Sequence, residues 1–337
     1  MKKKALITGI SGQDGSYLAE FLLNKNYEVH GIIRRVALEN ERHRLWRINH
    51  LLKKITLHPA SLESYASIVK IIQKTKPNEI YHLAAQSYVH YSFEDEFSTL
   101  NTNINGTHYM LSALKDFSPK SKFYFAASSE MFGKVRKNIQ DEETQFYPRS
   151  PYGISKVTGY QLTKNYREAY NLFACSGILF NHESPRRGIN FVTRKVTLGL
   201  AKILTKEIDC LELGNLSARR DWGFAGDYVE AIWQILQQEK PDDFVISTGE
   251  NYSIEDFVKE VFSIVGLDWT KFVKSNVSRY LRPSEVPSLL GDSTKAIKIL
   301  NWKPKIMFKD LCLMMVENDL KSFNLTLDEA RNIAKKL

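Results

Sequence analysis

Cysteine is scarce in this chain of 337 residues, which contains only Cys175, Cys210 and Cys312. Three scattered thiols cannot build the disulfide framework of a small secreted protein, and their spacing does not fit a metal site. No apolar run approaches the roughly 18 residues that cross a bilayer, and the apolar stretch near the start is too short for a signal peptide. We therefore expect a cytoplasmic protein with no bound metal and no membrane contact.

The chain also lacks internal repeats, low-complexity tracts and blocks of basic residues. Its net charge of +9 is spread along the sequence without a stacking motif, which argues against nucleic acid as a partner. Two interpretations of this charge stay open, a lysine-rich surface or attraction of small polyanions such as nucleotides. A hydrophobic content of 43% over this length allows one large domain or two of usual size.

A strand, a glycine-rich turn and a helix open the chain. The apolar residues 4–8 lead into Gly9, Gly12 and Gly15, and a helical pattern follows at once. In this arrangement backbone amides and a helix amino terminus receive a pyrophosphate, and glycine lets the phosphate approach the backbone. The spacing differs from the usual Gly-x-Gly-x-x-Gly, but its context favours a dinucleotide site over a turn without a ligand.

A second expected strand, 27–33, is followed by Arg34 and Arg35. An acid at this place suits the ribose 2′-hydroxyl of NAD, whereas an arginine suits a 2′-phosphate. The arginine pair therefore predicts NADP as the cofactor, with a solvated basic pair as the alternative.

Strand and helix patterns alternate through the first half of the chain, which predicts a parallel sheet covered on both faces. The further strands are expected at 55–58, 79–83, 122–127, 173–180 and 244–247, and the helices at 63–75, 97–116 and 151–170. We predict an α/β fold, a doubly wound Rossmann-like sheet with a smaller α/β C-terminal substrate-binding domain. The dinucleotide-binding domain is expected at 1–180, with about 215–250 returning to it. The cap is expected at 181–214 and 251–337, with helices at 253–264, 293–299, 308–321 and 326–336.

Tyr152 and Lys156 are four residues apart on the expected helix 151–170, so the phenol and the ammonium share one face. A tyrosine has a reference pKa of about 10 and is a poor base near neutrality unless a positive charge favours the phenolate. Lys156 can supply that charge. The spacing alone arises often by chance. Ser128 and Glu130 strengthen the catalytic interpretation of the pair, because they close another strand at the edge of the sheet where ligands bind.

Several longer stretches carry a resemblance to a known family. In chain order they are Thr-Gly-Ile-Ser-Gly-Gln-Asp-Gly-Ser-Tyr-Leu (8–18), Ser-Glu-Met-Phe-Gly-Lys-Val (129–135), Phe-Tyr-Pro-Arg-Ser-Pro-Tyr-Gly (146–153), Gly-Ile-Leu-Phe-Asn-His-Glu-Ser-Pro-Arg-Arg-Gly (177–188), Phe-Val-Thr-Arg-Lys (191–195), Arg-Asp-Trp-Gly (220–223), Asp-Tyr-Val-Glu-Ala (227–231) and Arg-Pro-Ser-Glu-Val (282–286). Over nearly its whole length the chain resembles the GDP-mannose 4,6-dehydratases of the extended short-chain dehydrogenase/reductase family.

The resemblance implies a lyase of deoxysugar biosynthesis that converts GDP-mannose to GDP-4-keto-6-deoxymannose, with internal hydride transfer from C4 to C6 through tightly bound NADP. Its catalytic residues would be Ser128, Glu130, Tyr152 and Lys156. Tyr152 would take the 4-hydroxyl proton, and Lys156 would lower the pKa of that tyrosine and hold the nicotinamide ribose. Glu130 would remove the C5 proton and assist loss of the 6-hydroxyl as water. Ser128 would hydrogen-bond the sugar oxygen.

The resemblance also implies two sets of binding residues. The cofactor set is Thr8, Gly9, Gly12, Gln13, Asp14, Gly15, Arg34, Arg35, Leu62, Leu83, Ala84, Ala85, Tyr152, Lys156, His182 and Arg187. The substrate set is Ser87, Asn181, Lys195, Leu213, Gly214, Arg220, Arg282 and Glu285. Arginines suit a diphosphate, and a glutamate suits a ribose diol or a guanine edge. A homodimer or homotetramer is expected from the family, commonly through helices such as 97–116 and 151–170.

Some positions depart from the family pattern. Ser128 replaces a threonine, Ser61 replaces an acid near the adenine, the loop 34–50 lacks the usual serines, and the segment 266–282 is short. These changes leave open the same dehydration of GDP-D-glycero-D-manno-heptose, a GDP-linked heptose. A GDP-sugar epimerase or reductase, and a non-catalytic NADP-binding sensor, are further alternatives. Glu130 argues for dehydration, because epimerases and reductases need no acid to expel the 6-hydroxyl.

Overall fold

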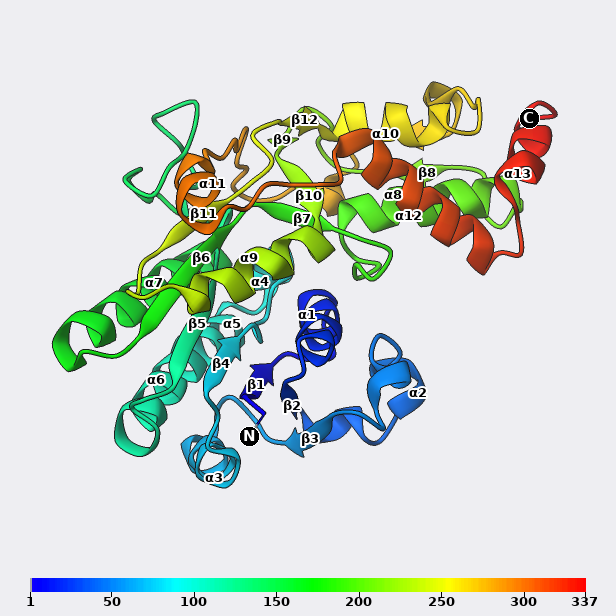
Figure 1. Ribbon diagram of the computed structural model, residues 1–337. Helices are drawn as coiled ribbons and strands as arrows, with labels where there is room; N and C mark the ends of the chain where they lie inside the picture. The colour runs from blue at the N-terminus through cyan, green and yellow to red at the C-terminus, as the bar shows by residue number, and fades with distance from the viewer. Residues whose placement is uncertain (1) are drawn as a thin grey trace.

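The computed structural model describes residues 2–337 and has a seven-stranded sheet at its centre (Figure 1). The spatial order is β11-β6-β5-β4-β1-β2-β3, and each neighbouring pair is parallel. The strands are β1 Lys4–Thr8, β2 Glu28–Ile33, β3 Thr56–Pro59, β4 Glu79–His82, β5 Lys122–Ser128, β6 Ala174–Leu179 and β11 Phe244–Ile246. The predicted doubly wound parallel sheet is confirmed.

Helices cover both faces of this sheet, which is why its strands are apolar on both sides. Helices α1 Gln13–Asn24 and α9 Ala225–Gln237 pack on each other and share one core with the sheet. The opposite face carries α3 Tyr65–Thr75, α6 Gly106–Phe117 and α7 Pro151–Tyr170 around a second core (Figure 1). The strand order reverses between β1 and β4, so the fold places its ligand crevice beyond the carboxyl ends of these strands.

The helix expected at 97–116 is divided in the structure. It consists of α5 Glu96–Leu100, a π-helical turn at Asn101–Asn105, and α6. A π turn adds a residue to a helical turn and often marks a functional position. Two shorter helices, α2 Glu41–Arg44 and α4 Tyr91–Glu94, lie in connecting segments. Among residues 2–337, no helix combines the length and the apolar character needed to cross a membrane.

A smaller unit lies above the sheet in Figure 1 and has its own apolar core. Its helices are α8 Val192–Leu204, α10 Ile254–Ser263, α12 Phe308–Ser322 and α13 Leu327–Ala334. Three two-stranded ribbons complete it: β7 Asn181–Glu183 with β10 Trp222–Phe224, β9 Arg219–Arg220 with β12 Tyr252–Ser253, and β8 Leu211–Glu212 with β13 Val273–Lys274. We call this unit the cap.

One helix that the sequence analysis assigned to the cap packs against the sheet. Helix α11, Thr294–Leu300, contacts β11 and α9. Ala296, Leu300 and Trp302 are buried in the same core as β1 and α9. The Trp302 indole also donates a hydrogen bond to the Asp227 carbonyl at 2.9 Å. The chain therefore returns to the sheet within the expected cap segment 251–337, because these apolar side chains find their partners there.

Candidate functional site

A cavity of about 1170 Å³ lies between the sheet and the cap. Pockets for one small ligand usually have roughly 300–1,000 Å³, so this cavity is larger than a usual pocket for one ligand. Thr8 and Arg35 lie outside it. The structure brings together all the other predicted site residues along its wall: Gly9, Gly12, Gln13, Asp14, Gly15, Arg34, Leu62, Leu83, Ala84, Ala85, Ser87, Ser128, Glu130, Tyr152, Lys156, Asn181, His182, Arg187, Lys195, Leu213, Gly214, Arg220, Arg282 and Glu285.

The two exceptions have clear physical reasons. Thr8 is buried behind the wall, where its hydroxyl accepts hydrogen bonds from the amides of Leu83 and Ala84, both at 3.1 Å. It therefore fixes the turn after β4 without facing the cavity. Arg35 begins a 3₁₀ turn, and its side chain is 84% exposed and pairs with Glu39 at 3.4 Å. The structure does not bring Arg35 to the cofactor site that the sequence predicted for it.

The glycine turn after β1 is shaped to receive phosphate. Gly9 has φ +74° and approaches Ala84 so closely that a Cβ atom would lie 2.9 Å from that amide nitrogen. A Cβ atom at Gly15 would overlap the Gly9 carbonyl oxygen. Gly12 precedes α1 and offers no capping side chain, so the first amides of the helix are free to bind an anion at the cavity wall. The residues present thus fit a dinucleotide.

Helix α7 positions the tyrosine and the lysine. Ser150 caps the helix by accepting a hydrogen bond from the Gly153 amide at 3.0 Å, and Pro151 occupies the first turn. Tyr152 and Lys156 both face inward and are almost fully buried. The helix begins here because the N-cap residue Ser150 and Pro151 directly precede Tyr152.

The π turn braces this helix from the side. Buried Asn103 donates from its side-chain amide to the Ser155 hydroxyl at 2.9 Å and to the Gln86 carbonyl at 3.0 Å. The Gln86 amide donates back to the Asn103 side-chain oxygen at 2.8 Å. Ser155 in turn donates to the Tyr152 carbonyl at 2.7 Å. The loop after β4 and the first turn of α7 are thereby tied together, although the sequence analysis did not single out Asn103.

Burial dominates the protonation of Tyr152 and Lys156. It raises the pKa of Tyr152 to about 12, and the hydrogen bond with Ser128 only partly offsets it. Burial also lowers the pKa of Lys156 to about 8. The ammonium donates to the Ala126 carbonyl at 2.7 Å and lies 5.7 Å from the centre of the Tyr152 ring. The sequence analysis expected Lys156 to lower the pKa of Tyr152. In this structure Lys156 is not among the groups that shift that pKa.

Glu130 belongs to a cluster of two carboxylates and two guanidinium groups. Its Oε1 atom lies 3.3 Å from Arg282 Nη1 and 4.0 Å from Arg220 Nη2. Glu285 lies 3.4 Å from Arg220 and 3.8 Å from Arg282. Arg220 is anchored because its Nη1 donates to the carbonyls of Arg219 and Val286. Oε2 of Glu130 is buried without a hydrogen-bond partner among the described residues, so this oxygen is free to act on a ligand.

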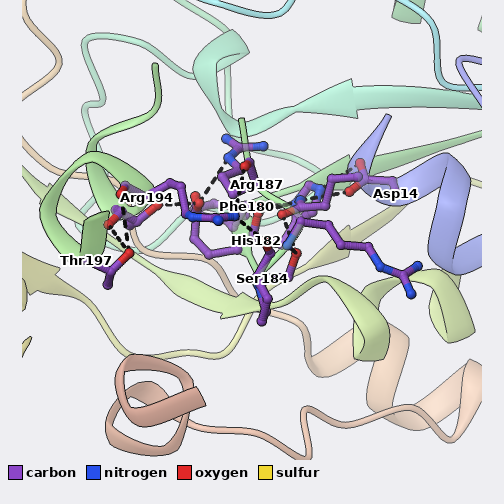
Figure 2. A network of polar contacts seen from close by, with 12 residues as sticks. Asp14, Phe180, His182, Ser184, Arg187, Arg194 and Thr197 are labelled. Atoms are coloured by element: carbon purple, nitrogen blue, oxygen red, sulfur yellow. Dashed lines mark hydrogen bonds and ion pairs between the residues drawn. The ribbon is translucent and has the colours of Figure 1, made fainter. Parts of the chain in front are cut away.

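Figure 2 shows a polar network that joins α1 to the segment after β6. His182 contacts the Phe180 carbonyl through Nδ1 at 2.7 Å and Asp14 through Nε2 at 2.9 Å. Both partners accept, so both ring nitrogens carry protons. Burial opposes that charge, but Asp14 outweighs it and raises the pKa of His182. Asp14 is partly buried, which opposes its charge, yet His182 lowers its pKa to about 2. This pair fixes the amino terminus of α1 to the cap side of the cavity.

The sequence analysis missed several residues of the wall, among them His43, Arg44, Arg47 and Tyr280. The basic residues stand in a run after the second strand, and that charge was the available signal. Tyr280 gave no signal, because only the fold brings its ring to 3.2 Å from Lys195 Nζ. Within residues 2–337, no group of three or more metal-ligating side chains is placed to hold a metal ion.

Comparison with known proteins identifies close relatives over nearly the full chain. The family described as GDP-mannose 4,6 dehydratase matches residues 6–315. GDP-mannose 4,6 dehydratase 2 of Arabidopsis thaliana is 50% identical, covering 95% of this chain and 87% of the relative. GDP-mannose 4,6 dehydratase of Homo sapiens is 48% identical, covering 94% of this chain and 91% of the relative.

Solved structures share the fold at lower sequence identity. A UDP-glucose 4-epimerase of Thermotoga maritima with UDP-glucose has a TM-score of 0.83 at 24% identity, covering 95% of this chain and 99% of its own. A dTDP-glucose 4,6-dehydratase of Bacillus anthracis with NAD has a TM-score of 0.82 at 18% identity, covering 97% and 99%. RMD from Pseudomonas aeruginosa with NADPH has a TM-score of 0.79 at 21% identity, covering 95% and 100%.

Proposed function

This chain belongs to the GDP-mannose 4,6-dehydratase family and is a hydro-lyase that removes water from GDP-mannose, and from this premise we propose which residues carry the reaction. The relatives are named for GDP-mannose, so the GDP-linked heptose is not favoured as the substrate, nor is an epimerase or reductase reaction. One observation supports the proposal most strongly: Glu130 lines the same cavity as Tyr152 and Lys156.

In this proposal Tyr152 takes the proton of the sugar 4-hydroxyl. Its raised pKa means that the phenolate needs positive charge nearby. Lys156 supplies one charge from the next turn of α7, and a bound oxidised nicotinamide adds another. Ser128 stands beside the phenol, whose pKa it lowers, and in this proposal it hydrogen-bonds the same sugar oxygen. Lys156 also holds the nicotinamide ribose.

Glu130 takes the C5 proton once C4 is oxidised, and it then protonates the departing 6-hydroxyl. Arg282 and Arg220 hold Oε1, so the unpartnered Oε2 is the oxygen that carries this proton. General acid–base catalysis of this kind typically contributes about 10²–10⁴-fold to the rate.

The reaction uses a nicotinamide cofactor, and we assign NADP. When bound, the nicotinamide would supply hydride transfer, from C4 first and then back to C6 while C5 regains a proton, so that the cofactor would end as it began. The glycine turn and the first turn of α1 would hold its pyrophosphate. Arg34 lines the cavity directly after β2, where an arginine suits a 2′-phosphate. Leu62, Leu83, Ala84 and Ala85 supply the apolar wall.

The substrate nucleotide would lie on the cap side, where basic and polar groups converge. Lys195, Arg220 and Arg282 are assigned to its phosphates and ribose, and Glu285 to its ribose or guanine. Asn181, Ser87, Leu213 and Gly214 complete this wall. Arg282 can bind the nucleotide while it holds Glu130, because only its Nη1 contacts Glu130 and Glu285.

The function is tested by the mass of the product. Full-length protein incubated with GDP-mannose and no added reductant is expected to release one water from each nucleotide sugar. An epimerase leaves the mass unchanged, and a reductase consumes reduced cofactor in proportion to product. An unchanged mass with both NADP and NAD present would contradict the proposal. The heptose analogue, run in parallel, is expected to react more slowly.

The alkaline pH dependence tests the role of Lys156. Its pKa of about 8 means that the charge is present below that pH and is lost as the pH rises through it. We expect turnover to fall on the alkaline side at about that point, because the phenolate of Tyr152 loses its nearby cation. Lys156→Arg should be slower overall but keep its charge, so this fall should disappear from its kcat profile. The same fall in the variant would assign the titration to another group.

We also propose a homodimer or homotetramer in a reducing, cytoplasmic compartment. The side of α5 and α7 exposes large apolar side chains, including Phe97 at 81% and Ile154 at 48%. These two helices pack on each other and would present one continuous surface to a second copy. All three cysteines are free thiols, which suits a reducing compartment.

A further inference from the structure

A group of cations surrounds Arg47 near the glycine turn, and all the others in it are paired with carboxylates. Arg186 pairs with Glu20 at 2.5 Å. The other pairs are Arg187 with Glu183 at 2.9 Å, Arg194 with Asp319 at 2.7 Å, and His182 with Asp14 at 2.9 Å. Arg47 differs from them: among residues 2–337, no carboxylate lies within ion-pair distance of its guanidinium. It is the cation of this group left for an outside partner.

The hydrogen bonds of Arg47 hold its guanidinium in place but do not neutralise it. Its Nε donates to the Arg186 carbonyl at 2.7 Å, and its Nη1 lies 3.5 Å from the Ser11 carbonyl. The side chain is partly buried. Burial, followed by the charges of Arg194, Arg187 and Arg186, lowers the pKa of Arg47 to about 10. A partly buried cation among like charges is costly unless an anion compensates it.

The position of Arg47 indicates which anion this is. The residue lines the cavity together with Arg34, His43 and Arg44, all from the segment that follows β2. Adenosine ribose binds at the end of this strand in such folds. The pyrophosphate has its own donors at the amino terminus of α1. We propose that Arg47 binds the 2′-phosphate of the dinucleotide together with Arg34, and so takes the place in the arginine pair that the sequence gives to Arg35.

This inference rests on the NADP assignment made above and is tested by nucleotide affinity. In Arg47→Gln, the full-length protein freed of nucleotide is expected to bind NADPH about tenfold or more weakly, since a charged hydrogen bond is lost. Its affinity for NADH should change less than about twofold, because NADH lacks the 2′-phosphate. Cofactor fluorescence, titrated separately with the two nucleotides, measures both constants.

Matched variants separate this role from a general loss of charge. Arg42→Gln removes the same charge from the same segment, and Arg42 is exposed and outside the cavity wall, so it should leave both affinities unchanged. Arg47→Lys keeps a cation and should recover part of the NADPH binding. Equal melting temperatures without nucleotide would show that the variants are folded.

Three results would overturn the inference. Equal weakening of NADPH and NADH would place Arg47 at the pyrophosphate, and unchanged NADPH affinity would remove it from the site. A selective loss in Arg35→Gln without one in Arg47→Gln would return the role to Arg35. Equal affinity of the unmodified protein for the two nucleotides is a different outcome, because it would refute the NADP assignment itself.

Discussion

Glu130→Gln is expected to stop the loss of water from GDP-mannose, with turnover reduced by about 10²–10⁴-fold. Glutamine keeps the shape of the side chain, and its carbonyl oxygen can still accept from Arg282. It cannot take a proton from C5. Oxidation at C4 does not need this group, so the near-ultraviolet absorbance of reduced nicotinamide should appear and persist after mixing with substrate. In deuterium oxide, the C5 proton should not exchange.

Glu285→Gln is the matched control, because Glu285 contacts the same two arginines as Glu130. This substitution should mainly raise KM and leave kcat nearly unchanged, since we assign Glu285 to binding of the nucleotide. Near-normal turnover in Glu130→Gln would contradict the role of Glu130. A rise in KM alone, with C5 exchange intact, would make Glu130 a substrate ligand and leave the base unidentified.

Tyr152→Phe is expected to reduce turnover by a similar factor, about 10²–10⁴-fold, but at an earlier step. Phenylalanine fills the buried space and removes only the hydroxyl that takes the 4-hydroxyl proton. Neither the near-ultraviolet absorbance nor the C5 exchange should then develop. The two variants should therefore fail differently: Glu130→Gln after oxidation at C4, and Tyr152→Phe before it.

The control for this substitution lies on the same helix. Tyr170→Phe makes the same chemical change at the end of α7, where the ring is half exposed and outside the cavity. It should leave turnover unchanged. Persistent absorbance of reduced nicotinamide in Tyr152→Phe would show that another group removes the 4-hydroxyl proton.

The sheet was predictable because its strands are apolar on both faces and stand between clear helical patterns. The start of α7 was predictable from Ser150 and Pro151, which form an N-cap with proline in the first turn. The π turn at Asn101–Asn105 was not, since the side-chain period of 97–116 still fits a continuous helix. Nor was the packing of α11 on the sheet, because an amphipathic helix does not reveal which core it will join.

The candidate site was likewise predictable from the sequence only in part. Glycine spacing and the Tyr–Lys pair are local patterns, so the sequence located them. Whether Arg34, Arg35 or Arg47 faces the cavity depends on how the chain turns after β2, and a 3₁₀ turn carries Arg35 into solvent. The contacts of Arg282 and Arg220 with Glu130 join residues far apart in the chain. Such contacts follow from tertiary packing, which short motifs do not encode.

The bond between Glu130 and Arg282 also has a consequence for protein engineering. In the proposed mechanism, Arg282 binds the nucleotide and also orients the carboxylate that moves the C5 proton, since it contacts Glu130. Under that mechanism, nucleotide recognition and proton transfer cannot be altered separately. A chimera that imports the loop around Arg282 from a relative with another nucleotide preference also imports the placement of its proton carrier.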